Sequence, residues 1–427
     1  MKTRDRAQAR HRTRRRPRHQ PARSPRWLLA LGPAFIAAIA YVDPGNVAAN
    51  LSAGAQFGYL LLWVLVLANL MAMLIQYQSA KLGLVTGRSL PRLVGERTRP
   101  TTRRAYWLQA ELVAAATDIA EVIGGALALK ILFGLPLVLG GIIVGAVSLA
   151  LLLLQSRHQQ RRFEGVIIAL LAVILIGFLS ALFIQPPNGG AMLGGLLPRF
   201  DGTESILLAC SMIGATVMPH AIYIHSQLVL DRFGAPPRQV RDQLLRHTRI
   251  DVIIALVIAG TINIGLLLVA ATSLPGRADT DTIEGAHAAI ADTFGPVIGV
   301  LFGLGLLASG LASTSVGAYA GSTIMSGLLR IRVPLIARRA VTLIPALVIL
   351  GVGFNPTLAL VLSQVVLSFG IPFALIPLLR LTGDRKLMGQ HADGIAVRVL
   401  GWTSALLIVA LNAVLLALTA GFLADAA

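Results

Sequence analysis

Charged residues are scarce in this chain of 427 residues: they make up 13% of it, whereas a soluble globular domain has about 25%. The chain has a single cysteine, Cys210, which excludes a disulfide framework and any metal cluster built from cysteines. We interpret Cys210 as a small buried residue of a helix. The sequence also lacks a histidine-rich metal motif and a recognisable nucleophile–base pair, so we expect no enzymatic activity and no cofactor.

Long apolar runs dominate the sequence instead, with 56% hydrophobic residues and a mean hydropathy of +0.75. Runs of this length predict an all-α integral membrane protein. We expect eleven transmembrane helices, at 27–55, 57–84, 105–133, 135–155, 163–185, 205–231, 250–273, 294–329, 335–354, 356–381 and 396–423. Between the spans, the acidic segment 274–293 is typical of an amphipathic surface helix, and the small residues Ala308-Ser309-Gly310 indicate close helix packing.

The basic residues are distributed unevenly over the expected loops. Of the 37 Lys and Arg residues, 34 fall in the N-terminal tail or in the even-numbered loops, and only Lys130, Arg199 and Arg277 lie on the other side. By the positive-inside rule the N-terminus is cytoplasmic and the C-terminus lies outside a cell membrane. Residues 1–26 contain eleven Lys or Arg, and we predict a disordered basic tail that lies on the anionic leaflet. The net charge of +18 therefore does not indicate a nucleic-acid partner.

Two of the expected spans contain helix-breaking residues. Asp43-Pro44-Gly45-Asn46 interrupts the first span and Met218-Pro219-His220 interrupts the sixth. Such breaks are tolerated where the backbone faces a protein-lined cavity, and broken helices at matching positions in two halves are typical of a transport site. With five spans between them, the breaks predict a 5+5 inverted repeat. Its two halves are residues 27–185 and 205–381, and residues 396–423 form an appended helix.

The first break offers hard oxygen donors. Asp43 and Asn46 lie three residues apart, so that a carboxylate and an amide oxygen can converge on a cation. Pro44 frees the main-chain carbonyl of Ala40, which is a further candidate ligand. In the alternative interpretation Asp43 is only the N-cap of the second half-helix.

The second break adds a softer donor. The thioether of Met218 favours later transition metals over Mg²⁺ and Ca²⁺, which points to Mn²⁺, Fe²⁺ or a neighbouring ion as cargo. The carbonyl of Ala215, one turn earlier, and the amide of Gln364 in span ten are further candidates. Alternatively, Met218 only fills the core and Gln364 only bonds across helices. His220 can bind metal or lie on a proton path, whereas we interpret His225 as structural.

Span three contains Glu111, Asp118 and Glu121, which lie within about 80° on one helix face. Intramembrane carboxylates are functional candidates, and Arg338 and Arg339 at the start of span nine are the available cations. This row predicts a proton relay. The alternative is a static ion-pair network that holds helices together.

Three motifs together resemble those of the NRAMP family of divalent metal–proton symporters, in particular its bacterial manganese transporters. They are Ile39-Ala-Tyr-Val-Asp-Pro-Gly-Asn46, Ala116-Thr-Asp-Ile-Ala-Glu121 and Gly214-Ala-Thr-Val-Met-Pro-His220. The similarity extends from about Leu31 to Leu379. Ala221 departs from the pattern, in which asparagine often follows the histidine.

The resemblance implies the leucine-transporter fold and import of Mn²⁺ or Fe²⁺ with protons by a monomer in the lipid bilayer. It implies that the metal is bound by Asp43, Asn46, Met218, Ala215, Ala40 and Gln364. It also implies that protons are handled by Asp43, His220, Asp118, Glu121, Glu111, Arg338 and Arg339. Three alternatives remain from the residues alone: a metal-selective channel, a transporter of the same fold for Mg²⁺ or an organic substrate, and an enzyme with an intramembrane metal.

Overall fold

The computed structural model describes residues 32–153, 160–275, 280, 282–329 and 335–425, and these residues form helices and connecting segments without a β-strand. The predicted basic tail, 1–26, lies outside the described residues. The first half contains α1 (Pro33–Ile39), η2 (Ala40–Val42), α2 (Pro44–Phe57), α3 (Leu62–Thr86), α4 (Leu90–Arg97), α5 (Pro100–Phe133), α6 (Leu137–Leu153) and α7 (Gln160–Ile184). The second half contains α8 (Gly189–Gly195), α9 (Gly202–Thr216), α10 (Pro219–Phe233), α11 (Arg238–Ser273), α12 (Ile283–Phe294), α13 (Pro296–Leu328), α14 (Leu335–Gly351), α15 (Pro356–Thr382), α16 (Arg385–Met388), η3 (Gly389–His391) and α17 (Ile395–Asp425).

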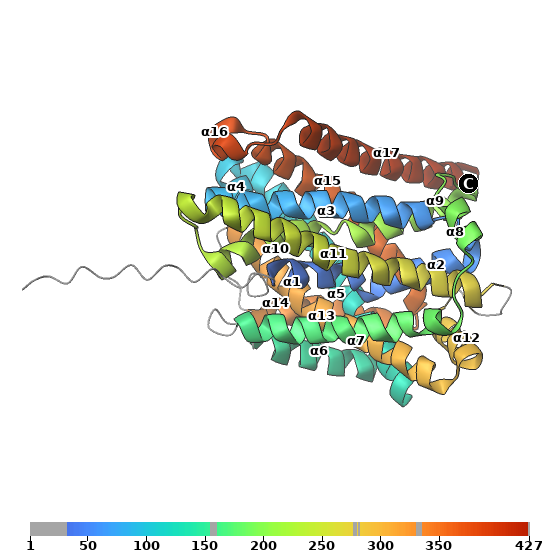
Figure 1. The fold of residues 1–427 in the computed structure, drawn as a ribbon. Helices are drawn as coiled ribbons and strands as arrows, with labels where there is room; N and C mark the ends of the chain where they lie inside the picture. The colour runs from blue at the N-terminus through green and yellow to red at the C-terminus, as the bar shows by residue number, and fades with distance from the viewer. Residues whose placement is uncertain (1–31, 154–159, 276–279, 281, 330–334, 426–427) are drawn as a thin grey trace, which may run out of the picture.

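The long helices lie side by side, with their axes roughly aligned through the molecule (Figure 1). Within the described part of the chain, eight helices are long and apolar enough to cross a membrane. Three shorter apolar helices fall in the predicted spans one, four and nine, at Pro33–Val42, Leu137–Ala150 and Ala340–Gly351. The all-helical membrane fold is thus confirmed, while the number of eleven crossings stays a prediction.

Both predicted breaks are present. The first span divides into α1 with the 3₁₀ turn η2 on one side and α2 on the other, and the sixth span divides into α9 and α10. The residue before each proline, Asp43 or Met218, has an extended backbone, with ψ angles of 166° and 125°. The steric demand of a following proline disfavours the helical conformation there, so each helix must end and restart.

The loops lie at two opposite ends of the helices. The short helices α4 and α16 lie at one end, and α8 and α12 lie at the other (Figure 1). At the first end a buried ion pair joins Lys81 of α3 to Asp393, and Arg97 pairs with Asp384. At the second end Lys130 pairs with Glu284. The described parts of predicted loops two and ten therefore lie at one end, and those of predicted loops five and seven lie at the other.

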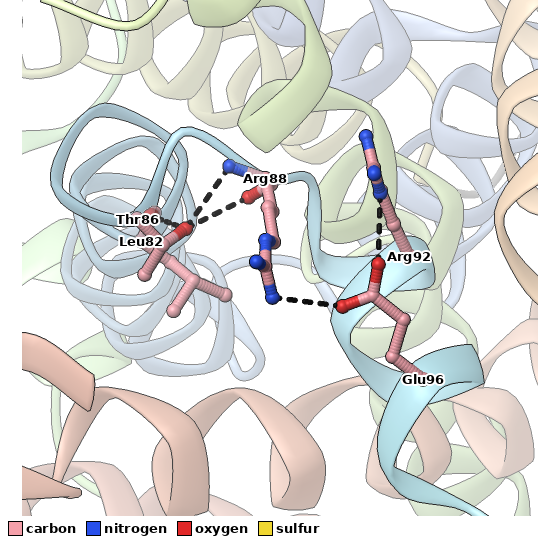
Figure 2. A network of polar contacts seen from close by, with 5 residues as sticks. All are labelled: Leu82, Thr86, Arg88, Arg92 and Glu96. Carbon is pink, nitrogen blue, oxygen red and sulfur yellow. Dashed lines mark hydrogen bonds and ion pairs between the residues drawn. The ribbon is translucent and has the colours of Figure 1, made fainter. Parts of the chain in front are cut away.

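The helix α4 was not predicted, because it is short and polar. Figure 2 shows how it is fixed beside the end of α3: Glu96 binds Arg92 one turn earlier and Arg88 in the preceding turn, at 2.9 and 3.0 Å. Thr86 accepts a hydrogen bond from the Arg88 N–H at 3.1 Å, which closes the turn between the helices. These arginine side chains are more than half exposed, at 52% and 62%.

Several predicted boundaries differ from the structure, most of all at α11, and one loop helix agrees with it. Helix α11 begins at Arg238, twelve residues before the predicted span, since polar helix-forming residues continue the helix beyond the apolar run. Helix α5 likewise begins at Pro100 rather than at 105. The amphipathic helix expected in 274–293 is α12, which buries Ile283, Ala286, Ala289 and Ile290.

Helices α5 and α13 pack closely in the core. A Cβ atom on Gly310 of α13 would lie 3.0 Å from the main-chain nitrogen of Gly125 in α5. The backbones therefore approach each other directly, as the small residues at 308–310 predict.

Candidate functional site

The first break is held by its own polar side chains. The Asp43 carboxylate accepts the main-chain N–H of Asn46 at 2.7 Å, so Asp43 is indeed the N-cap of α2. The same oxygen, Oδ1, also accepts a hydrogen bond from the side-chain amide of Asn46 at 2.9 Å. The second carboxylate oxygen, Oδ2, accepts one from Gln364 of α15 at 3.1 Å. Capping therefore explains only part of the environment of Asp43.

The two breaks meet. The side-chain amide of Asn46 donates to the main-chain carbonyl of Ala215 at 2.9 Å, and so links the start of α2 to the last turn of α9. A helix that stops at Thr216 leaves the carbonyls of its last turn without intrahelical partners. The structure thus brings together four of the predicted ligand residues: Asp43, Asn46, Ala215 and Gln364.

Two amide oxygens at this meeting point lack a partner. The Oδ1 atom of Asn46 and the Oε1 atom of Gln364 are buried, and neither accepts a hydrogen bond from any described residue. Buried polar atoms are nearly always hydrogen-bonded, so two unsatisfied acceptors beside a carboxylate indicate a place for a cation. Asp43, Asn46, Met218 and Gln364 are all 0% exposed, which means that the site is closed from both sides.

Met218 immediately precedes α10, and its side chain is fully buried. The break itself leaves Met218 out of both half-helices. A carboxylate, two amide oxygens and a main-chain carbonyl are hard donors, and the thioether of Met218, three residues after Ala215, is soft. Such a mixed set is suited to a first-row transition metal. No group of three or more His, Cys, Asp and Glu side chains that could hold a metal occurs in the described ranges.

The carbonyl groups beside Ala40 are bound by two residues that the sequence did not indicate. Asn263 of α11 donates to the carbonyl of Tyr41 at 2.7 Å, and Ser309 of α13 donates to that of Val42 at 2.5 Å. They stabilise the 3₁₀ turn that leads into the break. Ala40 is the first residue of that turn, and its role as a metal ligand stays a prediction.

A second hydrogen-bonded group lies on the α3 side of the first break. Gln76 of α3 donates to the Tyr41 hydroxyl at 2.5 Å and contacts Nδ1 of His225 at 2.7 Å. All three side chains are buried. His225 thus links α10 to α3, in agreement with its interpretation as a structural histidine.

The start of α1 is fixed by Asp251 of α11. Its carboxylate accepts the main-chain N–H groups of Gly32 and Ala34 at 3.2 and 3.0 Å. Next to it, Arg232 at the end of α10 pairs with Glu164 of α7 at 3.1 Å. These contacts hold the start of α1 and the end of α10, which are the ends away from the breaks, against α11 and α7.

Of the predicted proton-handling residues, Glu111, Asp118 and Glu121 lie on α5, and His220 lies on α10; α5 contacts both α10 and α13. Asp118, Glu121 and His220 are buried, at 1%, 0% and 2% exposure, and Glu111 is half-buried. The Glu121 carboxylate lies against Gly317 of α13, where a Cβ atom would be 3.0 Å from Oε1. The backbone of Arg338 and Arg339 belongs to α14, but their side chains lie outside the described residues.

Comparisons with known proteins agree with these features. Residues 34–418 match the family described as Nramp, natural resistance-associated macrophage protein-like. The chain is 62% identical over 387 residues to the divalent metal cation transporter MntH of Mycobacterium tuberculosis (strain ATCC 25618 / H37Rv), with 90% of each chain covered.

Two solved structures are similar to this fold. The manganese transporter of Eremococcus coleocola matches with a TM-score of 0.81 and 31% identity, covering 90% of this chain and 85% of that one. MHP1, a nucleobase-cation-symport-1 family transporter, matches with a TM-score of 0.56 and 16% identity, covering 90% and 92%. The latter similarity concerns the fold alone, and it extends to a transporter with an organic ligand.

Proposed function

We propose that this chain, which belongs to the Nramp family, is a secondary transporter that imports divalent transition-metal ions, Mn²⁺ or Fe²⁺, together with protons. It is a multi-pass membrane protein. Its relatives in Mycobacterium tuberculosis and Eremococcus coleocola are described as transporters of divalent metal cations and of manganese. We extend that substrate class to this chain.

One observation supports the proposal most directly: two buried amide oxygens, those of Asn46 and Gln364, have no partner among the described residues and flank Asp43. An ion at this point would turn the Asn46 amide, so that its oxygen faces the metal and the carbonyl of Ala215 is released. Met218 and the carbonyl of Ala40 would complete the set. Each of these donors replaces water that the ion loses on entering the site.

The site is closed in this state, because the Asn46 amide donates a hydrogen bond to the carbonyl of Ala215 and the Gln364 amide donates one to the carboxylate of Asp43. In a transport cycle Gln364 would withdraw from Asp43 to admit an ion from outside. The half-helix α1 would then move away from α11 to release the ion inside. The Asp251 contacts to Gly32 and Ala34 hold α1 in place and would have to open for this step.

Protons would use the same carboxylate. Asp43 changes charge when it exchanges a proton for a metal ion, so binding of metal and release of protons are linked. We propose that the proton moves inward along His220, Glu121, Asp118 and Glu111, toward the Arg338–Arg339 pair.

The orientation follows from the charge distribution. The end with α4 and α16 would face the cytoplasm, and the end with α8 and α12 would face outside. Import then means transport from the α12 end toward the α4 end. We expect a monomer to suffice, without a cofactor.

Uptake into proteoliposomes tests the proposal. We expect Mn²⁺ to accumulate beyond its electrochemical equilibrium when the outside is acidic, and Asp43→Ala to abolish uptake because it removes the carboxylate. Asp292→Asn, a change at an exposed carboxylate of α12, serves as the control and should transport normally. Uptake that only equilibrates Mn²⁺ with the outside, whatever the pH gradient, would instead identify a channel.

A further inference from the structure

A cavity lies on the outer side of the candidate metal site, at the end of the molecule where α9 and α15 begin. It has a volume of about 230 Å³ and is bounded by α2, α9 and α15. Among its lining residues are Ser52, Gln56, Glu204, Leu208, Asn355 and Val361. A water molecule takes up about 30 Å³ in the liquid, so this volume is near that of an ion with one shell of about six waters.

The three helices that form the cavity also form the metal site. Helix α2 provides Asn46 to the site and Ser52 to the cavity, six residues or about 9 Å further along the helix. Helix α9 provides Ala215 to the site and Glu204 to the cavity, about 16 Å apart by the same rise. Helix α15 provides Gln364 to the site. The cavity is thus aligned with the site along all three helices.

The cavity has a polar rim and a closed floor. Gln56, Glu204 and Asn355 are exposed at the rim, whereas Leu208 and Val361 are buried at 4% and 5% exposure. Below the rim, Ser211 of α9 donates to the carbonyl of Val361 at 3.2 Å and joins α9 to α15. The buried side chains of Leu208 and Val361 therefore lie between the cavity rim and the metal site along α9 and α15.

The polar groups of the cavity are suited to a cation. Glu204 has neither an ion-pair partner nor a hydrogen-bond partner for its carboxylate in the described structure. Ser52 is only 5% exposed, yet its hydroxyl, which lines the cavity, has no hydrogen bond within the described ranges. The small exposed part of Ser52 borders the cavity, so its hydroxyl is available to a water molecule or to the water shell of an ion there. The amide of Gln56 provides another oxygen on the same helix as Ser52.

We propose that this cavity is an outer capture site, where Glu204 holds a hydrated divalent cation before the ion loses its water and moves to the site at Asp43. The proposal rests on the proposed function, because it assigns a first station to the same substrate. Glu204 would bind the ion through its water shell, and Ser52 and Gln56 would bind waters of that shell. The capture site raises the local concentration of ions above the floor of Leu208 and Val361.

Glu204 also lies in the first turn of α9, where a negative charge favours the helix dipole. That role concerns the stability of the helix and does not require metal. A purely structural Glu204 would leave the Mn²⁺ concentration for half-maximal uptake unchanged after substitution. The two roles therefore differ in a measurable quantity.

The experiment uses the full chain in proteoliposomes and measures initial rates of Mn²⁺ uptake over a range of Mn²⁺ concentrations. For Glu204→Gln we expect the apparent KM to rise by at least about threefold, as lost electrostatic capture predicts, with an unchanged maximal rate. Gln56→Leu, which removes an amide oxygen from the facing wall, should raise KM in the same direction. Asp292→Asn removes an exposed carboxylate of α12 outside the cavity and should leave KM unchanged.

Salt distinguishes a local site from general surface charge. At about 0.1 M salt, charges further apart than about 10 Å are screened, so the KM difference should persist if Glu204 acts on an ion beside it. The capture site is wrong if the wild type transports Mn²⁺ but Glu204→Gln keeps the wild-type KM, or if its KM difference disappears with salt. If the wild type takes up no Mn²⁺, the proposed function itself fails, and the capture site with it.

Discussion

The side-chain amide of Asn46 donates a hydrogen bond to the main-chain carbonyl of Ala215 across 2.9 Å, although the two residues belong to different halves of the chain. The bond joins two helix ends that exist only because Pro44 and Pro219 interrupt their spans. It also leaves the amide oxygen of Asn46 without a partner in the described structure. The polar groups of the two breaks are therefore only partly paired with each other, and a bound cation would give the unpaired amide oxygen a partner.

Met218 should determine which ions are excluded. Met218→Ala removes the one soft donor from the proposed set, so hard ions such as Ca²⁺ and Mg²⁺ should compete better, while Mn²⁺ transport persists at lower affinity. We expect competition by Ca²⁺ to strengthen by about tenfold, which corresponds to about 1.4 kcal/mol. Competitive uptake in proteoliposomes measures it, and unchanged exclusion of Ca²⁺ would refute the role of the thioether.

Glu121 should affect protons rather than metal. Its carboxylate is fully buried on α5 and lies against α13, and it is not one of the proposed metal ligands. Glu121→Gln keeps the size of the side chain but removes its charge, so Mn²⁺ binding to the purified protein should remain, and the dependence of uptake on external pH should weaken. Two superimposable pH profiles, for the wild type and the variant, would argue for a static ion-pair network instead.

The sequence predicted the features that involve costly residues in a membrane. Pro44, Pro219 and Asp43 are expensive in an apolar helix, and their positions were therefore informative. Asn263 and Ser309 were not predicted as partners of the broken turn, because their hydrogen bonds connect residues 222 and 267 positions apart. A single asparagine or serine in an apolar run does not indicate which carbonyl it will reach.

The buried ion pair of Lys81 and Asp393 should matter more for stability than the exposed pairs of α4. Asp393→Ala leaves the Lys81 ammonium buried and unpaired, which typically costs about 3–5 kcal/mol. Arg92→Ala removes an exposed pair with Glu96 (Figure 2), where about 0.3–0.5 kcal/mol is usual. Thermal unfolding of both variants in detergent compares them. Equal melting temperatures would show that Lys81 finds another partner or reaches water.

Gly45 and Gly214 both lie against Gln364, but their substitution by alanine should have different effects. Gly45→Ala should change the conformation of the site, whereas Gly214→Ala should lower the stability of the protein. A Cβ atom on Gly45 would lie 1.7 Å from the Nε2 atom of Gln364, at the end of a flexible side chain that can move aside. Gly45→Ala should therefore displace Gln364 from Asp43 and favour a state open to the outside, with little loss of stability.

A Cβ atom on Gly214 would instead lie 2.1 Å from the main-chain oxygen of Gln364 and 2.9 Å from the nitrogen of Ser368. Main-chain atoms of a packed helix cannot withdraw alone, so Gly214→Ala should separate α9 from α15 and lower the melting temperature. Thiol labelling of a cysteine at Ser52, in a background without Cys210, reports outward opening in each variant. Because Ser52 is only 5% exposed in the closed state, its labelling should accelerate in Gly45→Ala. Unaltered labelling in Gly45→Ala would mean that the contact between Gln364 and Asp43 does not keep the outer side closed.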